Sequence, residues 1–408
     1  MSNKAKTTAM KNDGQPALTP KLRFPEFRDA EGWEIGKVDA LVDTVTPPKK
    51  LPTSRYASSG AFPIIDQSQA DICGWTDDHE ALIQDSLPLI IFGDHTCILK
   101  LIDRPFAQGA DGIKILKSRP KVGTPYLYQF LTYRPVVTEE YKRHYSILKE
   151  KVVSFPDPNT GEQQKIADCL TSVDELIAAQ GRKVDALKTH KKGLMQQLFP
   201  RQGETQPRLR FPEFQDTGEW EMMSIGQLGD VVTGSTPSTA RSEYYGGDRL
   251  FVSPADISDA RFIETTKTTL TSLGFEETRP IRANSVLFVC IGSTIGKVAQ
   301  NRHECATNQQ INAVVPYPGN SNGFVYYALS GMAEKIANLA GRQAVPIVNK
   351  SLFASVGLAV PKQPEQTRIA DVLSSLDETV SAQTQKLEAL RAHKKGLMQQ
   401  LFPSMEEA

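Results

Sequence analysis

A segment of 39 residues occurs twice in this 408-residue chain and restricts the folds that the chain can adopt. Residues 162–200 align without gaps on residues 365–403, with 25 of 39 positions identical. A shorter segment, Leu-Arg-Phe-Pro-Glu-Phe, occurs at residues 22–27 and again at 209–214. The regions between these segments share little sequence. Because a solenoid needs three or more short repeats, two large copies favour a pseudo-twofold arrangement instead.

Both copies of the 39-residue segment have the apolar spacing of a coiled coil. Seam positions alternate at intervals of three and four residues over about five heptads, which lets one helix pack along another. Thr160 with Gln163 fits a capping box at the first helix start, and Pro200 and Pro403 end the two helices. The predicted seam positions are Ile166, Leu170, Val173, Ile177, Gln180, Val184, Leu187, Leu194 and Leu198 in the first copy, and Ile369, Leu373, Leu376, Val380, Gln383, Leu387, Leu390, Leu397 and Leu401 in the second.

Each predicted helix needs a partner for its apolar stripe, and the two copies can serve each other. A globular region precedes each helix, so a parallel pair would crowd the two regions together. An antiparallel pair would place them at opposite ends, and we prefer it. Gln180, Gln383, Lys191 and Lys394 are polar residues in the seam. They either fix the register, because a slipped polar seam residue loses its partner, or are tolerated at an exposed edge.

Composition limits the classes of protein to which this chain can belong. The 47 basic and 47 acidic residues leave no net charge, so any nucleic-acid binding must rest on local patches. Five scattered cysteines form no metal-binding or disulfide pattern, and we expect them to be reduced and structural. No apolar run approaches the ~18 residues of a membrane span. We therefore expect a cytoplasmic protein without a membrane partner.

The repeated segments, with Gly-Ser-Thr-Pro-Ser at 234–238 and Tyr-Tyr-Gly-Gly at 244–247, resemble the specificity subunits of type I restriction-modification enzymes. The likeness covers nearly the whole chain after residue 20. It implies an α+β fold in which two globular mixed α/β target-recognition domains lie at opposite ends of an antiparallel two-helix coiled coil, with pseudo-twofold symmetry. We assign residues 1–20 to a disordered tail, 21–157 to the first recognition domain, 158–200 to the first spacer helix, 201–207 to a linker, 208–363 to the second recognition domain, 364–403 to the second spacer helix and 404–408 to a tail.

The resemblance also implies a function and partners. A non-catalytic specificity subunit would bind double-stranded DNA with a bipartite target and dock two modification (adenine methyltransferase) subunits and restriction subunits. A helix of on the order of 50 Å corresponds to about 15 base pairs, so two readers held apart by it would leave an unread gap. The alternative is a coiled-coil scaffold that binds proteins and has no sequence-specific affinity for DNA.

Local charge and polar loops identify candidate DNA-binding residues in the second variable region. Residues 279–302 and 335–362 each hold four basic and no acidic side chains, although such patches are often only solvated surface. Polar side chains on loops can read base edges, mainly Arg on guanine and Asn or Gln on adenine. The candidates are Ser235, Thr236, Ser238, Arg241, Tyr244, Ser293, Thr294, Lys297, Asn308, Gln309, Gln310, Arg342, Gln343 and Asn349.

The first variable region offers a similar strand and turn. By position, residues 89–96 match 287–294, and residues 108–111 match 307–310. Residues 101–151 hold ten basic against five acidic side chains. The carboxylate of Asp94 could accept from cytosine or could cap its turn. The candidates are Lys49, Lys50, Arg55, Tyr56, Asp94, His95, Thr96 and Gln108.

Motifs for catalysis are incomplete. The Gly-Ser-Thr-Ile-Gly-Lys turn at 292–297 has one residue too few for a phosphate loop, and Val298 stands where Ser or Thr should hold magnesium. Asp157, Glu162 and Lys165 lack nuclease spacing, and the six histidines show no metal spacing. We find no methyl-transfer motif. We therefore predict no cofactor, no metal and no catalytic residue, and a self-sufficient enzyme is disfavoured.

Overall fold

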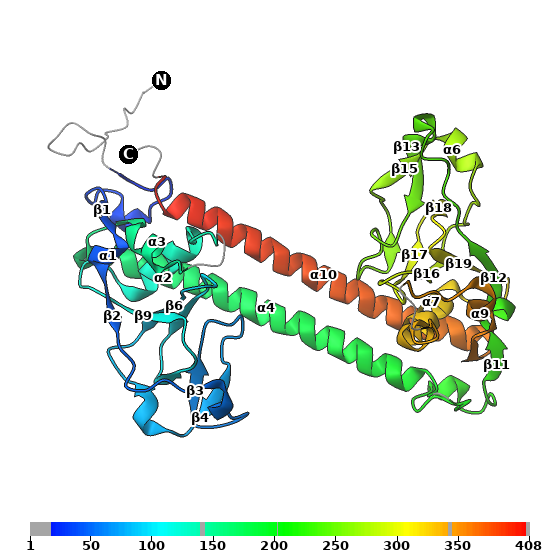
Figure 1. Ribbon diagram of the computed structural model, residues 1–408, viewed down its shortest axis with the longest axis horizontal. Helices are drawn as coiled ribbons and strands as arrows, with labels where there is room; N and C mark the ends of the chain where they lie inside the picture. The colour runs from blue at the N-terminus through cyan, green and yellow to red at the C-terminus, as the bar shows by residue number, and fades with distance from the viewer. Residues whose placement is uncertain (1–17, 139–142, 202, 342–344, 405–408) are drawn as a thin grey trace. The chain divides into compact units, whose positions relative to one another are not determined.

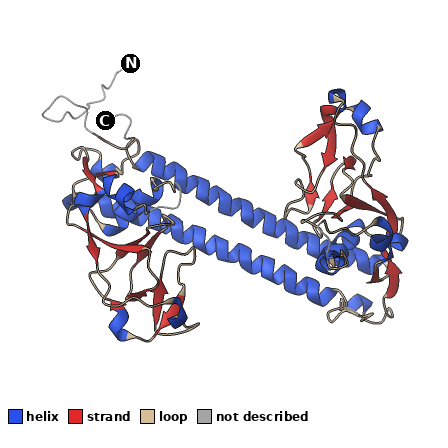
Figure 2. Ribbon diagram, in the orientation of Figure 1, coloured by secondary structure: helices blue, strands red, loops and turns tan. Residues whose placement is uncertain are grey.

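The computed structural model describes residues 18–138, 143–201, 203–341 and 345–404, and the chain forms two compact units. Unit 1 comprises the residues up to 180 together with those from 386 onward, and unit 2 comprises residues 181–385. Each unit contains one globular region of strands and short helices and a part of each of two long helices, α4 (Glu162–Leu198) and α10 (Gln363–Leu401) (Figures 1 and 2). The predicted mixed α/β class and the two long helices are confirmed.

Unit 1 contains three small sheets, with strand orders β2-β9-β6-β7, β4-β3-β8-β5 and β1-β10. Helix α2 lies against the first of these, where apolar residues of β6 and β9 join its buried face. The elements are β1 (Glu34–Lys37), α1 (Val38–Leu41), β2 (Val42–Val45), β3 (Phe62–Ile65), β4 (Gly74–Thr76), β5 (Leu82–Ile83), β6 (Leu89–Gly93), β7 (Leu99–Ile102), β8 (Phe106–Gln108), β9 (Ile113–Ser118), α2 (Thr124–Tyr133), α3 (Tyr145–Glu150) and β10 (Val152–Phe155).

Unit 2 also contains three sheets, with strand orders β12-β19-β16-β17-β14, β15-β13-β18 and β11-β20. The elements are β11 (Glu221–Ser224), α5 (Ile225–Leu228), β12 (Gly229–Thr233), β13 (Tyr245–Val252), β14 (Phe262–Ile263), β15 (Thr268–Leu270), α6 (Ser272–Glu276), β16 (Val286–Val289), β17 (Val298–Asn301), β18 (Cys305–Thr307), β19 (Ile311–Pro316), α7 (Asn322–Gly331), α8 (Ala333–Ala337), α9 (Lys350–Ser355) and β20 (Gly357–Val360).

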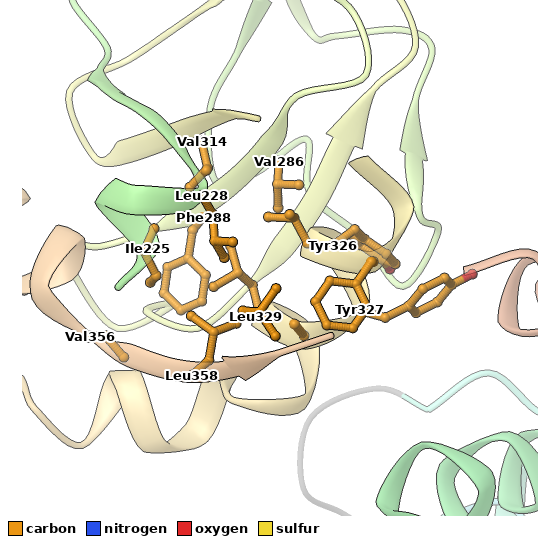
Figure 3. Packing of buried hydrophobic residues seen from close by; sticks show 14 of the residues in the cluster. Ile225, Leu228, Val286, Phe288, Val314, Tyr326, Tyr327, Leu329, Val356 and Leu358 are labelled. Atoms are coloured by element: carbon orange, nitrogen blue, oxygen red, sulfur yellow. The ribbon is translucent and has the colours of Figure 1, made fainter. Parts of the chain in front are cut away.

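The core of unit 2 joins its sheet to its helices. Phe288 and Val314 on neighbouring strands pack with Tyr327 and Leu329 of α7, and all four are buried (Figure 3). Ile369 of α10 and Leu198 of α4 belong to the same cluster. In unit 1 the corresponding cluster includes Ile166 of α4 and Leu401 of α10. The long helices are therefore part of each globular core.

The two units share one internal plan. The first and last strands of each globular region form an antiparallel pair, β1 with β10 and β11 with β20. Both units also contain an equivalent parallel pair: Ile65 of β3 lies opposite Gln108 of β8, and Val252 of β13 lies opposite Thr307 of β18. The predicted match of 108–111 with 307–310 therefore holds at its first position.

The predicted match of residues 89–96 with 287–294 is wrong by two residues. Gly93 lies opposite Ile113, and Val289 lies opposite Ile311. Gly93 therefore corresponds to Val289 and not to Ile291. Both strands are runs of buried apolar residues, which look alike in any register, so their sequences did not indicate the shift.

Within each unit, the segments of α4 and α10 run antiparallel and are joined by an ion pair. In unit 1, Lys394 Nζ binds Asp174 Oδ1 at 2.6 Å, while Leu401 shares a cluster with Ile166. In unit 2, Lys191 pairs with Asp377. The two seam lysines thus occupy equivalent places, and every predicted seam position is buried or half-buried.

We expect Lys394→Asp to lower the free energy of unfolding by roughly 2 kcal/mol, because two carboxylates would then face each other where a charged hydrogen bond was lost. Adding Asp174→Lys should recover most of that loss. Recovery should be incomplete, since Gln129 Nε2 donates to Asp174 Oδ2 at 2.9 Å and would meet an ammonium instead. Urea denaturation of the two variants measures both effects. A single variant as stable as the parent would contradict the antiparallel contact.

The capping box predicted for Thr160 and Gln163 is wrong. The amide oxygen of Gln163 accepts from Gly123 N at 2.7 Å, and its nitrogen donates to the carbonyls of Lys121 and Pro156. Gln366 makes the matching bonds in unit 2, to Ser321 N and to the carbonyl of Pro361. This repeated glutamine therefore ties each long helix to its globular region, and at the start of α4 Thr160 Oγ1 accepts from Glu162 N at 3.3 Å.

The described residues also bear on disulfides, membrane spans and metal sites. The five cysteines are free, and burial raises the pKa of the Cys290 and Cys305 thiols to about 12, so both are held as thiols. None of the helices in the described part of the chain is both long and apolar enough to cross a membrane. Within the described ranges, no group of three or more His, Cys, Asp and Glu side chains could hold a metal ion.

Candidate nucleic-acid interface

Three loops of unit 2 that carry predicted DNA-binding residues lie against one another. The loop after β12 joins the end of β18, because Ser235 N donates to the carbonyl of Thr307 at 2.9 Å. Thr236 Oγ1 then donates to Gln309 Oε1 at 2.6 Å. Gln310 Nε2 reaches the carbonyl of Ile291, at the start of the turn between β16 and β17, at 3.4 Å. The structure thus brings together residues from three predicted segments.

Exposure separates these residues into two groups. Thr236, Ser238, Gln309 and Ser293 are exposed, whereas Asn308 and Gln310 are half-buried. Asn308 Nδ2 donates to Gln310 Oε1 at 3.0 Å, which stiffens the loop between β18 and β19. The exposed members therefore offer hydroxyl and amide groups to a ligand.

The glycine at 234 explains how closely the loops approach. A Cβ at Gly234 would lie 2.2 Å from the carbonyl oxygen of Asn308 and 2.3 Å from that of Thr307. Both are backbone oxygens, which cannot move away by a change of side-chain rotamer. Any larger residue would separate Thr236 from Gln309.

Lys297 has an intramolecular role in this structure. Its ammonium donates to the carbonyl of Ile257 at 2.9 Å and to that of Pro254 at 3.4 Å, and so holds the loop after β13. Thr294 lies in the same turn and is half-buried. A phosphate contact by Lys297 stays a prediction.

Arg241 and Tyr244 form a pair. Arg241 Nη1 donates to Tyr244 Oη at 2.6 Å, and the guanidinium lies 5.4 Å from the centre of the ring. Tyr244 is buried, whereas Arg241 is exposed. The tyrosine therefore orients an exposed arginine.

The last group of predicted residues in unit 2 is Arg342, Gln343 and Asn349. Asn349 caps helix α9, since its Oδ1 accepts from Leu352 N at 2.9 Å. Arg342 and Gln343 lie outside the described residues. Other basic side chains of this region are engaged locally: Arg302 lies 3.9 Å from the ring centre of Phe262, and Arg279 donates to the carbonyl of Thr233.

Unit 1 brings its predicted residues together in a similar way. Lys50 lies beside Gln108 in an isolated parallel bridge, and its ammonium binds Asp111 Oδ1 at 2.6 Å. Thr96 Oγ1 donates to the carbonyl of Gln67 at 2.9 Å. Lys49 pairs with Asp78 at 2.6 Å, and Arg55 is exposed. The loops at 49–56, 66–69, 94–97 and 108–112 thus meet at one edge.

Four predicted residues of unit 1 are buried or half-buried. Asp94 is buried, and its Oδ1 accepts from Tyr145 N at 2.8 Å at the start of α3. Gln108 is also buried, so a base contact by either residue would need the loop to open. Burial raises the pKa of Tyr56, whose hydroxyl accepts from Ala110 N at 2.8 Å. His95 is half-buried beside Gln67, and its backbone N–H donates to Gln67 Oε1.

Sequence reasoning missed Gln67 and its neighbours Asp66 and Lys100. Asp66 Oδ1 accepts from Cys73 Sγ at 2.7 Å, and Lys100 Nζ donates to the carbonyl of Asp66 at 3.0 Å. A signal was present: residues 66–69 follow a short apolar strand as polar residues, like the predicted segments. Only the parallel pairing of β3 with β8 shows that this strand ends beside Gln108.

Comparison with known proteins agrees with the motifs. Residues 217–392 match the family model described as the type I restriction modification DNA specificity domain. Over 352 residues the chain is 26% identical to the type I restriction enzyme EcoR124I/EcoR124II specificity subunit of Escherichia coli, covering 81% of this chain and 83% of that one. It is 32% identical over 149 residues to the HindI specificity subunit of Haemophilus influenzae, covering 35% of this chain and 32% of that one.

The fold has a solved counterpart. The crystal structure of the type I restriction-modification system S subunit from M. genitalium superposes with a TM-score of 0.65 at 16% sequence identity. That match covers 95% of this chain and all of the other. At such low identity the match establishes the likeness of fold alone.

Proposed function

We propose that the chain is a specificity subunit of a type I restriction-modification system and that each of its two units reads one half of a split DNA target. A specificity subunit is the non-catalytic member of such a system. The target would be double-stranded DNA in the cytoplasm, and the chemistry would come from two modification subunits and from restriction subunits.

One observation carries the proposal: the two units share a scaffold but not the side chains at its loop ends. The strand pairs, the repeated glutamines and the helix ion pairs recur in both units. The loops differ, with Lys50, Gln67 and Thr96 in unit 1 and Thr236, Arg241 and Gln309 in unit 2. Base choice depends on such side chains, so two different half-sites are expected.

The docking of two copies of one modification subunit is supported by large apolar side chains that are exposed at equivalent positions of both units. Leu22 and Leu209 are 42% and 40% exposed, and Ile35 and Met222 are 55% and 60% exposed. Each pair occupies equivalent positions of the repeat. Two copies of one partner need the same contact residues in both units, and these pairs meet that requirement.

The proposal is tested by co-expressing the chain with its modification subunit and mapping modified adenines across a genome by single-molecule sequencing. We expect one motif made of two short specified parts and an unspecified gap. If the purified complex has no sequence-dependent affinity for DNA and modifies no motif, the chain is instead a coiled-coil scaffold.

Arg241→Ala and Gln309→Ala should each relax one position in the same half of the motif. Loss of a good base contact reduces discrimination against the wrong base by about 1–3 kcal/mol. The other half should be unchanged, because it is read by unit 1. Gln385→Ala, on an exposed face of α10, is the matched control. A motif unaltered in both variants would remove Arg241 and Gln309 from the reading set.

A further inference from the structure

The side chain of Gln67 lies where the reading loops of unit 1 meet. Strand β3 ends at Ile65, beside Gln108 at the end of β8, and the two strands are parallel. The segments that follow them therefore leave the sheet at the same edge. Gln67 is the second residue after β3 and is half-buried.

The backbone of Gln67 is held firmly, whereas its amide is held weakly. Its carbonyl accepts from Thr96 Oγ1 at 2.9 Å. The side-chain Oε1 accepts from His95 N at 3.4 Å, and Nε2 donates to the carbonyl of Asp111 at 3.5 Å. Hydrogen bonds of this type are usually about 2.9–3.0 Å long. The amide is thus oriented by two long bonds that a better partner can replace.

Two glycines provide the space for this side chain. A Cβ at Gly112 would lie 2.4 Å from Gln67 Nε2, and Gly112 has a φ of +100° that side chains rarely adopt. A Cβ at Gly93 would lie 2.3 Å from Thr96 Oγ1 and 3.2 Å from Gln67 Cβ. The amide therefore occupies a fitted position between the turn after β6 and the loop before β9.

The loop that carries Gln67 is braced from behind. Lys100 is buried, and its ammonium donates to the carbonyls of Asp66 and Ala70. The carboxylate of Asp66 accepts from Ser68 N at 2.8 Å and from Cys73 Sγ at 2.7 Å. The buried ammonium of Lys100 therefore fixes the loop without using the amide of Gln67, which stays available for recognition.

We propose that Gln67 is a specificity-determining residue of unit 1 and that its amide reads the edge of an adenine in the first half-site. A glutamine amide presents one acceptor and one donor at the spacing of adenine N6 and N7. Lys49, Lys50 and Arg55 carry positive charge on the same group of loops, where they can meet phosphates. This inference rests on the proposed function and adds a residue to it.

The test compares Gln67→Ala and Gln67→Asn with Gln69→Ala in the complete complex with the modification subunit. Gln69 is exposed, lies two residues away on the same loop and is the matched control. Modified adenines are mapped by single-molecule sequencing, and binding of the complex to matched and single-substituted duplexes is measured. We expect both Gln67 variants to lose discrimination at one base pair of the first half-site, by about 5- to 150-fold. The control should keep the parental motif.

The possible outcomes separate the inference from its premise. A first half-site that stays fully specified in Gln67→Ala overturns the role of Gln67 while the split target stands. Relaxation in the half that also responds to Arg241→Ala overturns it too, because that half belongs to unit 2. Absence of any motif in the parental complex overturns the proposed function itself.

Discussion

Replacing Arg210 by Met should lower the free energy of unfolding of unit 2 by about 3–5 kcal/mol, because it leaves a buried carboxylate without its partner. Arg210 Nε donates to Glu365 Oε1 and Nη2 donates to Glu365 Oε2, both at 2.8 Å. The side chain of Glu365 is only 2% exposed. Arg210 also donates to the carbonyl of Gly218, so the same side chain joins the repeated motif to the start of α10.

The measurement can use Trp220 as its reporter. Trp220 Nε1 donates to Glu365 Oε1 at 3.3 Å, so its indole fluorescence during urea denaturation senses this contact once Trp33 and Trp75 are replaced by Phe. The double variant Arg210→Met with Glu365→Leu should recover much of the loss, because no charge is then left buried. Arg368→Met is the exposed control: Arg368 pairs with Glu213 at 3.3 Å, both about half exposed, and a change within about 1 kcal/mol is expected. A single Arg210 variant no less stable than this control would refute the buried pair.

The Arg210–Glu365 pair shows why the sequence reveals the repeated Leu-Arg-Phe-Pro-Glu-Phe motif but not its structural role. Arg23 and Glu162 form the equivalent hydrogen-bonded pair in unit 1. They are 139 positions apart in the sequence, and Arg210 and Glu365 are 155 apart. Nothing local to either residue indicates the other. Heptad spacing is local, which is why the predicted seam positions are buried or half-buried. The capping-box prediction was wrong because the partner of Gln163 is also distant in the sequence: its amide oxygen accepts from Gly123 N, 40 positions away.

The candidate site was predictable only in outline. Loop position and residue type identified Thr236, Gln309 and Arg241, which the structure leaves exposed. They did not indicate that Asp94 is buried at the start of α3 or that Tyr244 is buried under Arg241. Gln67 became visible only through long-range strand pairing. Which loop ends meet depends on sheet topology, and one sequence does not encode that topology in any local pattern.

Two equivalent phenylalanines of the repeat differ in burial, so the same substitution should destabilise the protein to different extents at the two positions. Phe402 and Phe199 are equivalent residues at the ends of the two 39-residue copies. Phe402 is 1% exposed, and its ring centre lies 5.7 Å from that of Tyr126, 5.2 Å from that of Phe130 and 5.5 Å from that of Tyr133. Phe199 is half-buried and meets two rings, at 5.4 Å from Phe324 and 6.3 Å from Trp220.

We therefore expect Phe402→Ala to lower the free energy of unfolding by about 3–5 kcal/mol, since it removes a ring that fastens the end of α10 to helix α2 of unit 1. Phe199→Ala should cost clearly less, because part of its ring already faces water. Phe402→Leu, which keeps most of the buried volume, should lie between Phe402→Ala and the parent. Urea denaturation of the full chain gives all three values. An equal cost for the two alanine variants would mean that the shared sequence, and not the different burial of its two copies, determines stability at the helix ends.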